Sequence, residues 1–210
     1  MSTTTHSLPE LITAVKKAIN DNADEVAELD KAIGDGDHVI NLQRGLDAVS
    51  KLEDELKTSD WSAALMKVGM TLMSTMGGAS GSLFGSMFIS MSKTAKDKTM
   101  DLEGVAEIFN AGVESVKARG KADIGEKTML DTLIPATNSL KEDVAAGTSL
   151  ETALENMKQA ATAGMESTRD MLATKGRASF LGDRARGHID AGARTSQLVL
   201  CAIADFYLDK

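Results

Sequence analysis

Three aspartates, Asp30, Asp35 and Asp37, lie within the nine residues of the glycine-containing turn DKAIGDGDH. Clustered carboxylates repel one another unless cations neutralise them, and a set of oxygen ligands suits Mg²⁺ or Ca²⁺. An EF-hand loop is excluded because, counted from Asp35, Ile40 stands where the loop glycine belongs and Leu46 where the bidentate glutamate belongs. Two interpretations stay open: a metal site, or a solvated acidic turn built on ordinary Asp-Gly chemistry.

A second motif is the glycine-rich stretch MGGASG at residues 76–81, between two apolar helical patterns. The free N–H groups of a helix N-terminus bind anions, and Ser80 is expected to cap the following helix. The stretch is not a Walker A loop, since no Gly-Lys-Ser/Thr follows, and no strand precedes it as in a dinucleotide fingerprint. The alternative is close packing of two helices through the glycines.

The third motif, here called the basic loop, is TKGRASFLGDRARGHID at residues 174–190. It has no helical period and is too long for an idle connection in a compact domain. Its surroundings carry a local charge of +3, in a chain of net charge −8, from Arg169, Lys175, Arg177, Arg184, Arg186 and Arg194 against Asp170, Asp183 and Asp190. The basic loop either binds an anionic ligand or an acidic partner, or is a solvated loop whose ion pairs contribute little.

Together, a carboxylate cluster, a glycine-rich helix N-terminus and a basic loop are the parts needed to hold a nucleotide di- or triphosphate on Mg²⁺. The elements that must position them are helices, because apolar residues recur at i, i+3, i+4 and i+7 with no sustained alternation. One Trp, one Tyr and five Phe also leave little material for a sheet. We therefore predict an all-α fold of about eight helices.

The helix boundaries follow from capping signals. Ser7 and Glu10 form a predicted capping box for a first helix that runs to about Asp30, and later helices start after Ser59 or Asp60, Asp101, Ser149 and Asp190. Short connections favour antiparallel neighbours, so the prediction is one domain, residues 1–210, forming an up-and-down helical bundle or closed barrel.

Composition excludes several classes of protein. Lys and Arg number 23 against 31 Asp and Glu, a balance that argues against nucleic-acid and anionic-membrane partners. One cysteine, Cys201, excludes an intramolecular disulfide and multi-cysteine metal sites, and fits a reducing compartment. The N-terminus does not read as a secretion signal and no run of 18 apolar residues occurs. We expect a cytoplasmic protein.

Four segments in order, IGDGDHVINLQRG, TLMSTMGGASGSLFG, RGKADIGEKTMLDTL and TKGRASFLGDRARGHIDAGA, resemble the nucleotide-binding L subunits of dihydroxyacetone kinases. The resemblance spans nearly the whole chain, without a substrate-binding K domain. It implies an antiparallel barrel of eight helices, with the nucleotide held by the loops at one end.

The resemblance also implies site residues. Asp30, Asp35 and Asp37 would hold two Mg²⁺ ions that bridge the phosphates of a tightly bound ADP, and Arg177 would act catalytically on the phosphoryl group. The residues implied to contact the nucleotide are His38, Val39, Ile40, Asn41, Ala79, Ser80, Gly120, Met129, Arg177, Asp190, Ala191 and Gly192. Two positions depart from the family, since Val39 replaces a glycine and Ala191 replaces a frequent proline, which puts the nucleotide affinity in doubt.

The implied activity is that of a phosphoenolpyruvate–glycerone phosphotransferase subunit. Bound ADP would receive a phosphoryl group from the M subunit of a phosphotransferase system and deliver it to dihydroxyacetone on the K subunit. Two alternatives stay open: a regulatory protein that only senses nucleotide, and the L subunit of an ATP-dependent short-ketose kinase. The sequence does not decide whether two copies of the chain form a homodimer, or which short ketose is the substrate.

Overall fold

The fold is helical throughout the part of the chain that the computed structural model describes, which is residue 5, residues 7–96 and residues 98–209. This confirms the all-α prediction. The described residues form ten α-helices and two 3₁₀ helices: α1 (Leu8–Asp21), α2 (Ala23–Ile33), α3 (His38–Ser50), α4 (Glu53–Thr58), α5 (Trp61–Thr75), α6 (Gly78–Ala95), α7 (Leu102–Gly120), α8 (Leu130–Ala146), α9 (Leu150–Ser167), η1 (Thr168–Asp170), η2 (Arg177–Ala185) and α10 (Ala191–Leu208).

Four predicted helix starts are capped as the sequence indicates. The side chains of Asp60, Asp101, Ser149 and Asp190 each accept a hydrogen bond from the backbone N–H three residues further on. Such caps satisfy N–H groups that have no partner within the helix. The caps thereby fix where α5, α7, α9 and α10 begin.

Two boundary predictions at the N-terminal end are wrong. The first predicted helix is divided at Asn22, whose side-chain amide donates to the carbonyl of Ala18 at 2.8 Å and competes with the backbone ladder. Ser7 makes no capping hydrogen bond, and its backbone has a helical conformation in place of the extended one that is usual for a capping residue. With this division and the unpredicted short α4, the helix count exceeds eight.

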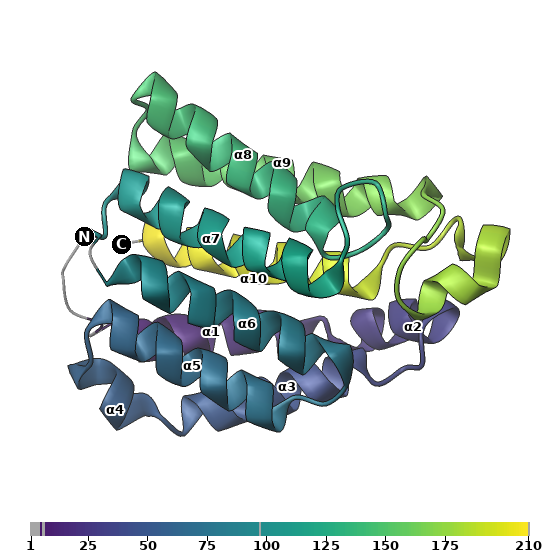
Figure 1. The fold of residues 1–210 in the computed structure, drawn as a ribbon, viewed down its shortest axis with the longest axis horizontal. Helices are drawn as coiled ribbons and strands as arrows, with labels where there is room; N and C mark the ends of the chain where they lie inside the picture. The colour runs from purple at the N-terminus through teal and green to yellow at the C-terminus, as the bar shows by residue number, and fades with distance from the viewer. Residues whose placement is uncertain (1–4, 6, 97, 210) are drawn as a thin grey trace.

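Consecutive helices pack side by side, most extensively in the pairs α5–α6, α6–α7 and α8–α9 (Figure 1). One core cluster lies among α7, α8, α9 and α10, and a second among α1, α3, α5 and α10. Helix α10 contributes Leu200 and Ala204 to the first cluster and Leu198 to the second. It therefore joins the two halves of the bundle.

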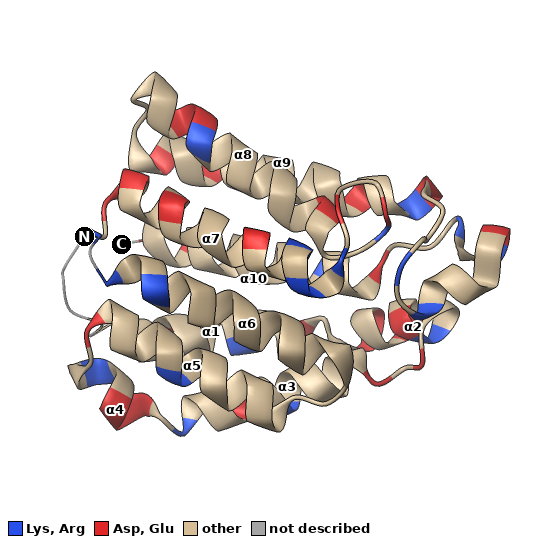
Figure 2. Ribbon diagram, viewed as in Figure 1, with Lys and Arg blue, Asp and Glu red and all other residues tan. Residues whose placement is uncertain are grey.

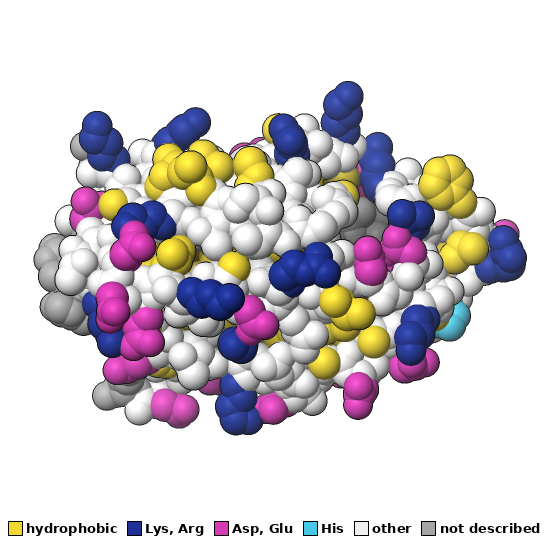
Figure 3. All heavy atoms as spheres, turned by 90° about the horizontal axis from the view of Figure 1, so that it is seen from below, with side chains coloured by type: hydrophobic (Ala, Val, Ile, Leu, Met, Phe, Trp, Pro, Cys, Tyr) yellow, Lys and Arg dark blue, Asp and Glu magenta, His cyan; other side chains and the backbone are white. Residues whose placement is uncertain are grey.

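The α2–α3 turn, the α7–α8 loop and the basic loop lie at one end of the bundle, and residues near the two chain termini lie at the other (Figure 1). Figure 2 shows that this loop end carries Lys and Arg as well as Asp and Glu. On the face drawn in Figure 3, side chains of both charges are interspersed with apolar ones. Within the described part of the chain, no helix combines the length and apolarity needed to cross a bilayer.

Candidate nucleotide and metal site

A cavity of about 390 Å³ lies among the loops at this end of the bundle. Segments far apart in the sequence line it, so it exists only when both halves of the chain are folded. The lining residues are Asp30, Ile33, Gly34, Asp35, Asp37, His38, Asn41, Gly77, Gly78, Ala79, Ser80, Leu83, Phe84, Lys127, Thr128, Met129, Lys175, Gly176, Arg177, Ala178, Asp190, Ala191 and Gly192.

The three aspartates of the α2–α3 turn come together at the cavity. One carboxylate oxygen from each of Asp30, Asp35 and Asp37 lies within 4.8 Å of the others. Asp30 is buried at the end of α2 and accepts a hydrogen bond from the backbone N–H of His38 at 3.0 Å, which closes the turn. A Cβ at Gly34 would lie 2.0 Å from an Asp30 carboxylate oxygen, so this position requires glycine. A set of three carboxylates suits a hard divalent cation such as Mg²⁺.

The N-terminus of α6 faces the same cavity. Helix α6 begins at Gly78, and its N-cap Gly77 provides no side-chain capping bond, so the first-turn N–H groups include donors left for an anion. A Cβ at Gly77 would lie 2.7 Å from the side-chain oxygen of Asn41, which explains the bare glycine there. The expected cap role of Ser80 is wrong, because Ser80 lies inside the first turn of α6.

His38 connects the two sides of the cavity. Its Nε2 lies 2.9 Å from the hydroxyl oxygen of Thr195 on α10, and its Nδ1 lies 3.4 Å from that of Ser80 on α6. Burial lowers the pKa of His38, and the neighbouring carboxylates of Asp30, Asp37 and Asp35 oppose this shift. Burial therefore favours the neutral ring, which lies between two hydroxyl groups.

Only part of the basic loop and its surroundings reaches the cavity. Arg177 pairs with Asp35 at 2.7 Å, and Lys175 pairs with Glu126 at 3.5 Å. Other cations are engaged elsewhere: Arg169 pairs with Glu166, Arg186 with Asp183 and Arg194 with Glu25. The part of the local positive charge that reaches the cavity is therefore concentrated at residues 175–177.

The structure places most of the predicted nucleotide contacts on this cavity, with three exceptions. Val39 points from α3 into the apolar core, and Ile40 is 55% exposed on the outer face of that helix. Successive helical residues are rotated by about 100°, so Asn41 returns to the side of His38 and the two residues between them do not. Gly120 does not line the cavity, and a Cβ added there would lie 3.5 Å from the side chain of Leu83, which does.

Sequence reasoning did not single out Lys127 or the apolar side chains Leu83 and Phe84. Leu83 and Phe84 follow the glycine motif by one turn of α6, a spacing that could have indicated that they line the same cavity. Lys127 is 1% exposed and has a φ of 61°, which is uncommon for a residue with a side chain. Nothing in the sequence distinguishes it from the many solvated lysines.

Comparison with known proteins decides the family. Residues 32–205 match the model of the DAK2 domain. The chain belongs to the DAK2 domain family. This DAK2 domain chain is 40% identical over 185 residues to the Listeria innocua "PEP-dependent dihydroxyacetone kinase 1, ADP-binding subunit DhaL", with 88% of each chain covered. It is 44% identical over 178 residues to the Lactococcus lactis "PTS-dependent dihydroxyacetone kinase, ADP-binding subunit DhaL", with 85% of each covered.

The fold of this DAK2 domain also occurs in a longer protein. The dihydroxyacetone kinase of C. freundii, solved in complex with AMP-PNP and Mg²⁺, superimposes with a TM-score of 0.73 at 24% identity. The match covers 94% of the DAK2 domain chain and 33% of that protein. The comparison shows a shared helical fold.

Proposed function

We propose that this chain is the ADP-binding subunit of a phosphoenolpyruvate-dependent dihydroxyacetone kinase. The observation that carries the proposal is a three-carboxylate cluster on the same cavity as the helix N-terminus at Gly78. This arrangement supplies ligands for divalent cations and N–H donors for phosphate oxygens in one cavity. Relatives at 40 and 44% identity, matched over most of their length, are named as ADP-binding subunits of such kinases.

In this proposal Asp30, Asp35 and Asp37 hold two Mg²⁺ ions, which neutralise phosphate charge when bound. Backbone N–H groups at Ala79 and Ser80 bind the phosphates, and the apolar wall of Leu83, Phe84 and Met129 accommodates the nucleoside. His38, Asn41 and the turn of Asp190, Ala191 and Gly192 complete the contacts. Val39, Ile40 and Gly120 would contribute through their backbone atoms alone.

Arg177 is the proposed catalytic residue. Its side chain is 70% exposed at the rim of the cavity and pairs with Asp35, close to where phosphate oxygens would lie. A cation at that place stabilises charge on a phosphoryl group during transfer, and needs no covalent step on the protein. The donor would be the M subunit and the acceptor dihydroxyacetone on the K subunit.

The alternative function, the L subunit of an ATP-dependent short-ketose kinase, has some support from matches of lower identity to longer proteins. The chain is 30% identical to the L-erythrulose kinase of Pectobacterium atrosepticum, of which it covers 34%. The identity to the PEP- and PTS-dependent subunits is higher, at 38 to 44%. The higher identity favours a subunit of a PEP- or PTS-dependent kinase over a subunit of an ATP-dependent short-ketose kinase.

Native mass spectrometry followed by reconstitution tests the proposed function. The purified chain should retain ADP and magnesium, and with phosphoenolpyruvate, the phosphotransferase components and the K subunit it should phosphorylate dihydroxyacetone. Labelled ADP added to the medium should stay largely unincorporated over many turnovers, because the nucleotide is recharged in place. Fast label exchange with full activity would instead identify an ATP-consuming kinase. Retention without transfer under any partner combination would identify a nucleotide sensor.

A further inference from the structure

Lys127 is a buried lysine whose three ammonium hydrogens all have acceptors. Its Nζ donates to the carbonyl oxygens of Thr168, of His188 at 2.5 Å and of Arg169 at 3.4 Å. An ammonium group has three donors and no acceptor. No hydrogen is left for a phosphate oxygen, although the side chain lines the cavity.

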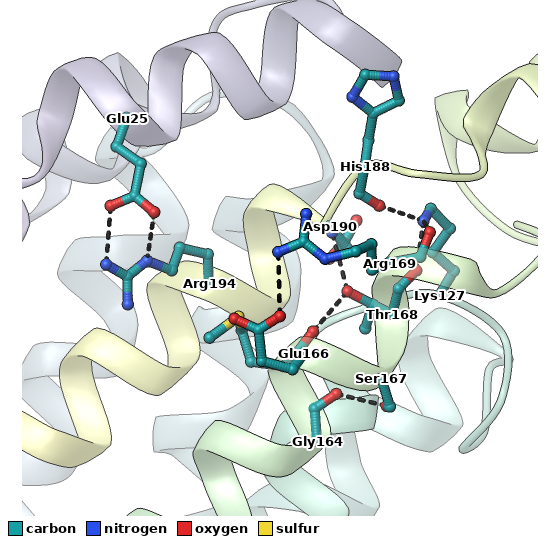
Figure 4. Close-up of polar contacts among 11 residues, drawn as sticks. Glu25, Lys127, Gly164, Glu166, Ser167, Thr168, Arg169, His188, Asp190 and Arg194 are labelled. Atoms are coloured by element: carbon teal, nitrogen blue, oxygen red, sulfur yellow. Dashed lines mark hydrogen bonds and ion pairs between the residues drawn. The ribbon is translucent and has the colours of Figure 1, made fainter.

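The three carbonyls belong to the two chain segments that meet at the base of the basic loop (Figure 4). The backbone N–H of Gly187 donates to the Arg169 carbonyl at 2.8 Å, and that of Asp190 donates to the Thr168 hydroxyl at 3.1 Å. Lys127 therefore lies where residues 168–169 join residues 187–190, and its ammonium connects the two segments.

The preceding residue supports the opposite part of the same loop. The Glu126 carboxylate accepts a hydrogen bond from the Thr174 hydroxyl at 2.8 Å and pairs with Lys175, and the Glu126 carbonyl accepts from the Thr174 N–H at 3.4 Å. The dipeptide Glu126-Lys127 thus contacts both the start and the end of the basic loop. Arg177 lies between these two attachments.

Negative charge around the Lys127 ammonium partly offsets the cost of its burial. The carbonyls of Thr168 and Arg169 follow the C-terminal end of α9, where the helix dipole is negative. Burial lowers the pKa of Lys127, while the carboxylates of Asp190, Asp170 and Asp131 oppose the shift. The neighbouring Arg169 guanidinium lowers it slightly, but pairs with Glu166.

We propose that Lys127 is a positioning residue that fixes the base of the basic loop and thereby holds Arg177 at the rim of the cavity beside Asp35. The proposal rests on the proposed function only in assigning Arg177 to phosphoryl transfer. A buried, fully hydrogen-bonded ammonium between two loop ends is a rigid attachment, and a positioned cation acts more strongly than a mobile one.

Hydrogen exchange of the nucleotide-free protein tests the structural half of the proposal. Lys127→Met keeps the length of the side chain and removes the donors. The Gly187 and Asp190 amides should then exchange at least about tenfold faster, while amides in the middle of α8 and α10 keep their protection. Lys141→Met, at an exposed lysine of α8 outside the basic loop and its contacts, is the control and should change nothing. Unchanged protection at Gly187 and Asp190 would overturn the proposal, whatever the activity of the chain.

A double-mutant cycle in the reconstituted transfer assay tests the functional half. If Lys127 acts through Arg177, Lys127→Met should slow transfer about 10- to 100-fold. Adding Arg177→Ala to Lys127→Met should then lower the transfer rate by less than a further factor of about three. Equal factors for Arg177→Ala in both backgrounds would show that Lys127 does not act through Arg177. If Lys127→Met does not fold by circular dichroism, Lys127→Gln, which keeps two N–H donors, is measured by the same two criteria.

Discussion

At the scale of single residues, the three aspartates have different tasks. Asp30 is buried and accepts the His38 N–H, so it shapes the turn as well as facing the cavity. Asp35 and Asp37 are exposed and lie within reach of a shared cation. Substitution of Asp37 should therefore affect ligand binding more than folding.

Asp37→Asn should weaken retention of Mg²⁺ and ADP by about 10- to 100-fold or more, because one of three carboxylate ligands is lost. Titration calorimetry of the nucleotide-free protein with Mg·ADP measures this. The nucleotide-free variant should melt no lower than the parent, since one of three repelling charges is gone. Asp54→Asn, on the exposed surface of α4, is the control. Equal affinity of the Asp37 variant and the parent would refute the metal assignment.

Asp190 gives a prediction with a defined pH window. Burial raises its pKa to about 6, and the Ala193 N–H and Lys127 oppose the shift. Between about pH 4 and pH 6 the Asp190 carboxyl keeps its proton in the folded state but loses it in the unfolded state. The contribution of this group to the unfolding free energy therefore falls as pH rises from about 4 to 6. Asp190→Asn keeps an oxygen for the Ala193 N–H and should raise the unfolding free energy of the nucleotide-free protein at pH 7 by about 1–3 kcal/mol.

Urea unfolding at pH 4.5 and pH 7.5 checks this expectation, since the gain should shrink at the lower pH. Asp101, the exposed N-cap of α7, is a control of opposite sign. Hydrogen bonds from Thr99 and Gly104 lower its pKa. Asp101→Asn should therefore lower the unfolding free energy relative to the parent, and this loss should be larger at neutral pH than in acid. A gain from Asp190→Asn that is the same at both pH values would contradict the explanation.

At this scale the sequence predicted which carboxylates come together. Asp30, Asp35 and Asp37 are close in one short glycine-containing turn, and the structure places all three at one cavity. The burial of Lys127 was not predictable, because its three acceptors are backbone carbonyls of residues more than forty positions away. Backbone acceptors leave no trace in residue types.

At the scale of elements, the helix starts were predictable where a side chain caps its own helix, as at Asp60 and Asp101. They were not predictable where the residue of capping type does not adopt the extended N-cap conformation, as at Ser7. Closely packed helix pairs are likewise only partly predictable from the sequence. A glycine in an apolar pattern shows that two helices can approach, and only the structure shows which ones.

Gly85 is such a contact between α5 and α6. A Cβ there would lie 2.6 Å from the Cβ of Met73 and 3.0 Å from the carbonyl oxygen of Gly69. Gly85→Ala should therefore lower the unfolding free energy by about 1–3 kcal/mol despite the better helix propensity of alanine. Urea denaturation followed by circular dichroism measures it, with the exposed Ser74→Ala on α5 as the control. A stabilised Gly85→Ala protein would show that the two helices separate without cost.

At the scale of the whole molecule, the cavity joins segments from both halves of the bundle. A ligand bound there stabilises only the folded chain, so its removal should lower the melting temperature of the entire bundle. At a ligand concentration of a hundred times Kd the difference is about 2.7 kcal/mol. Calorimetry of the ADP-loaded protein with and without EDTA checks this. An unchanged melting temperature in EDTA would contradict a metal-dependent site.

The position of α10 in both core clusters has a consequence for synthesis. Helix α10 follows every other described helix in the chain, and supplies Leu198 to one core and Leu200 and Ala204 to the other. While the ribosome still holds this segment, neither core is complete, and Asp190 has not yet met Lys127. Apolar faces of the earlier helices therefore stay open to chaperones until α10 emerges. The two halves of the protein become native together.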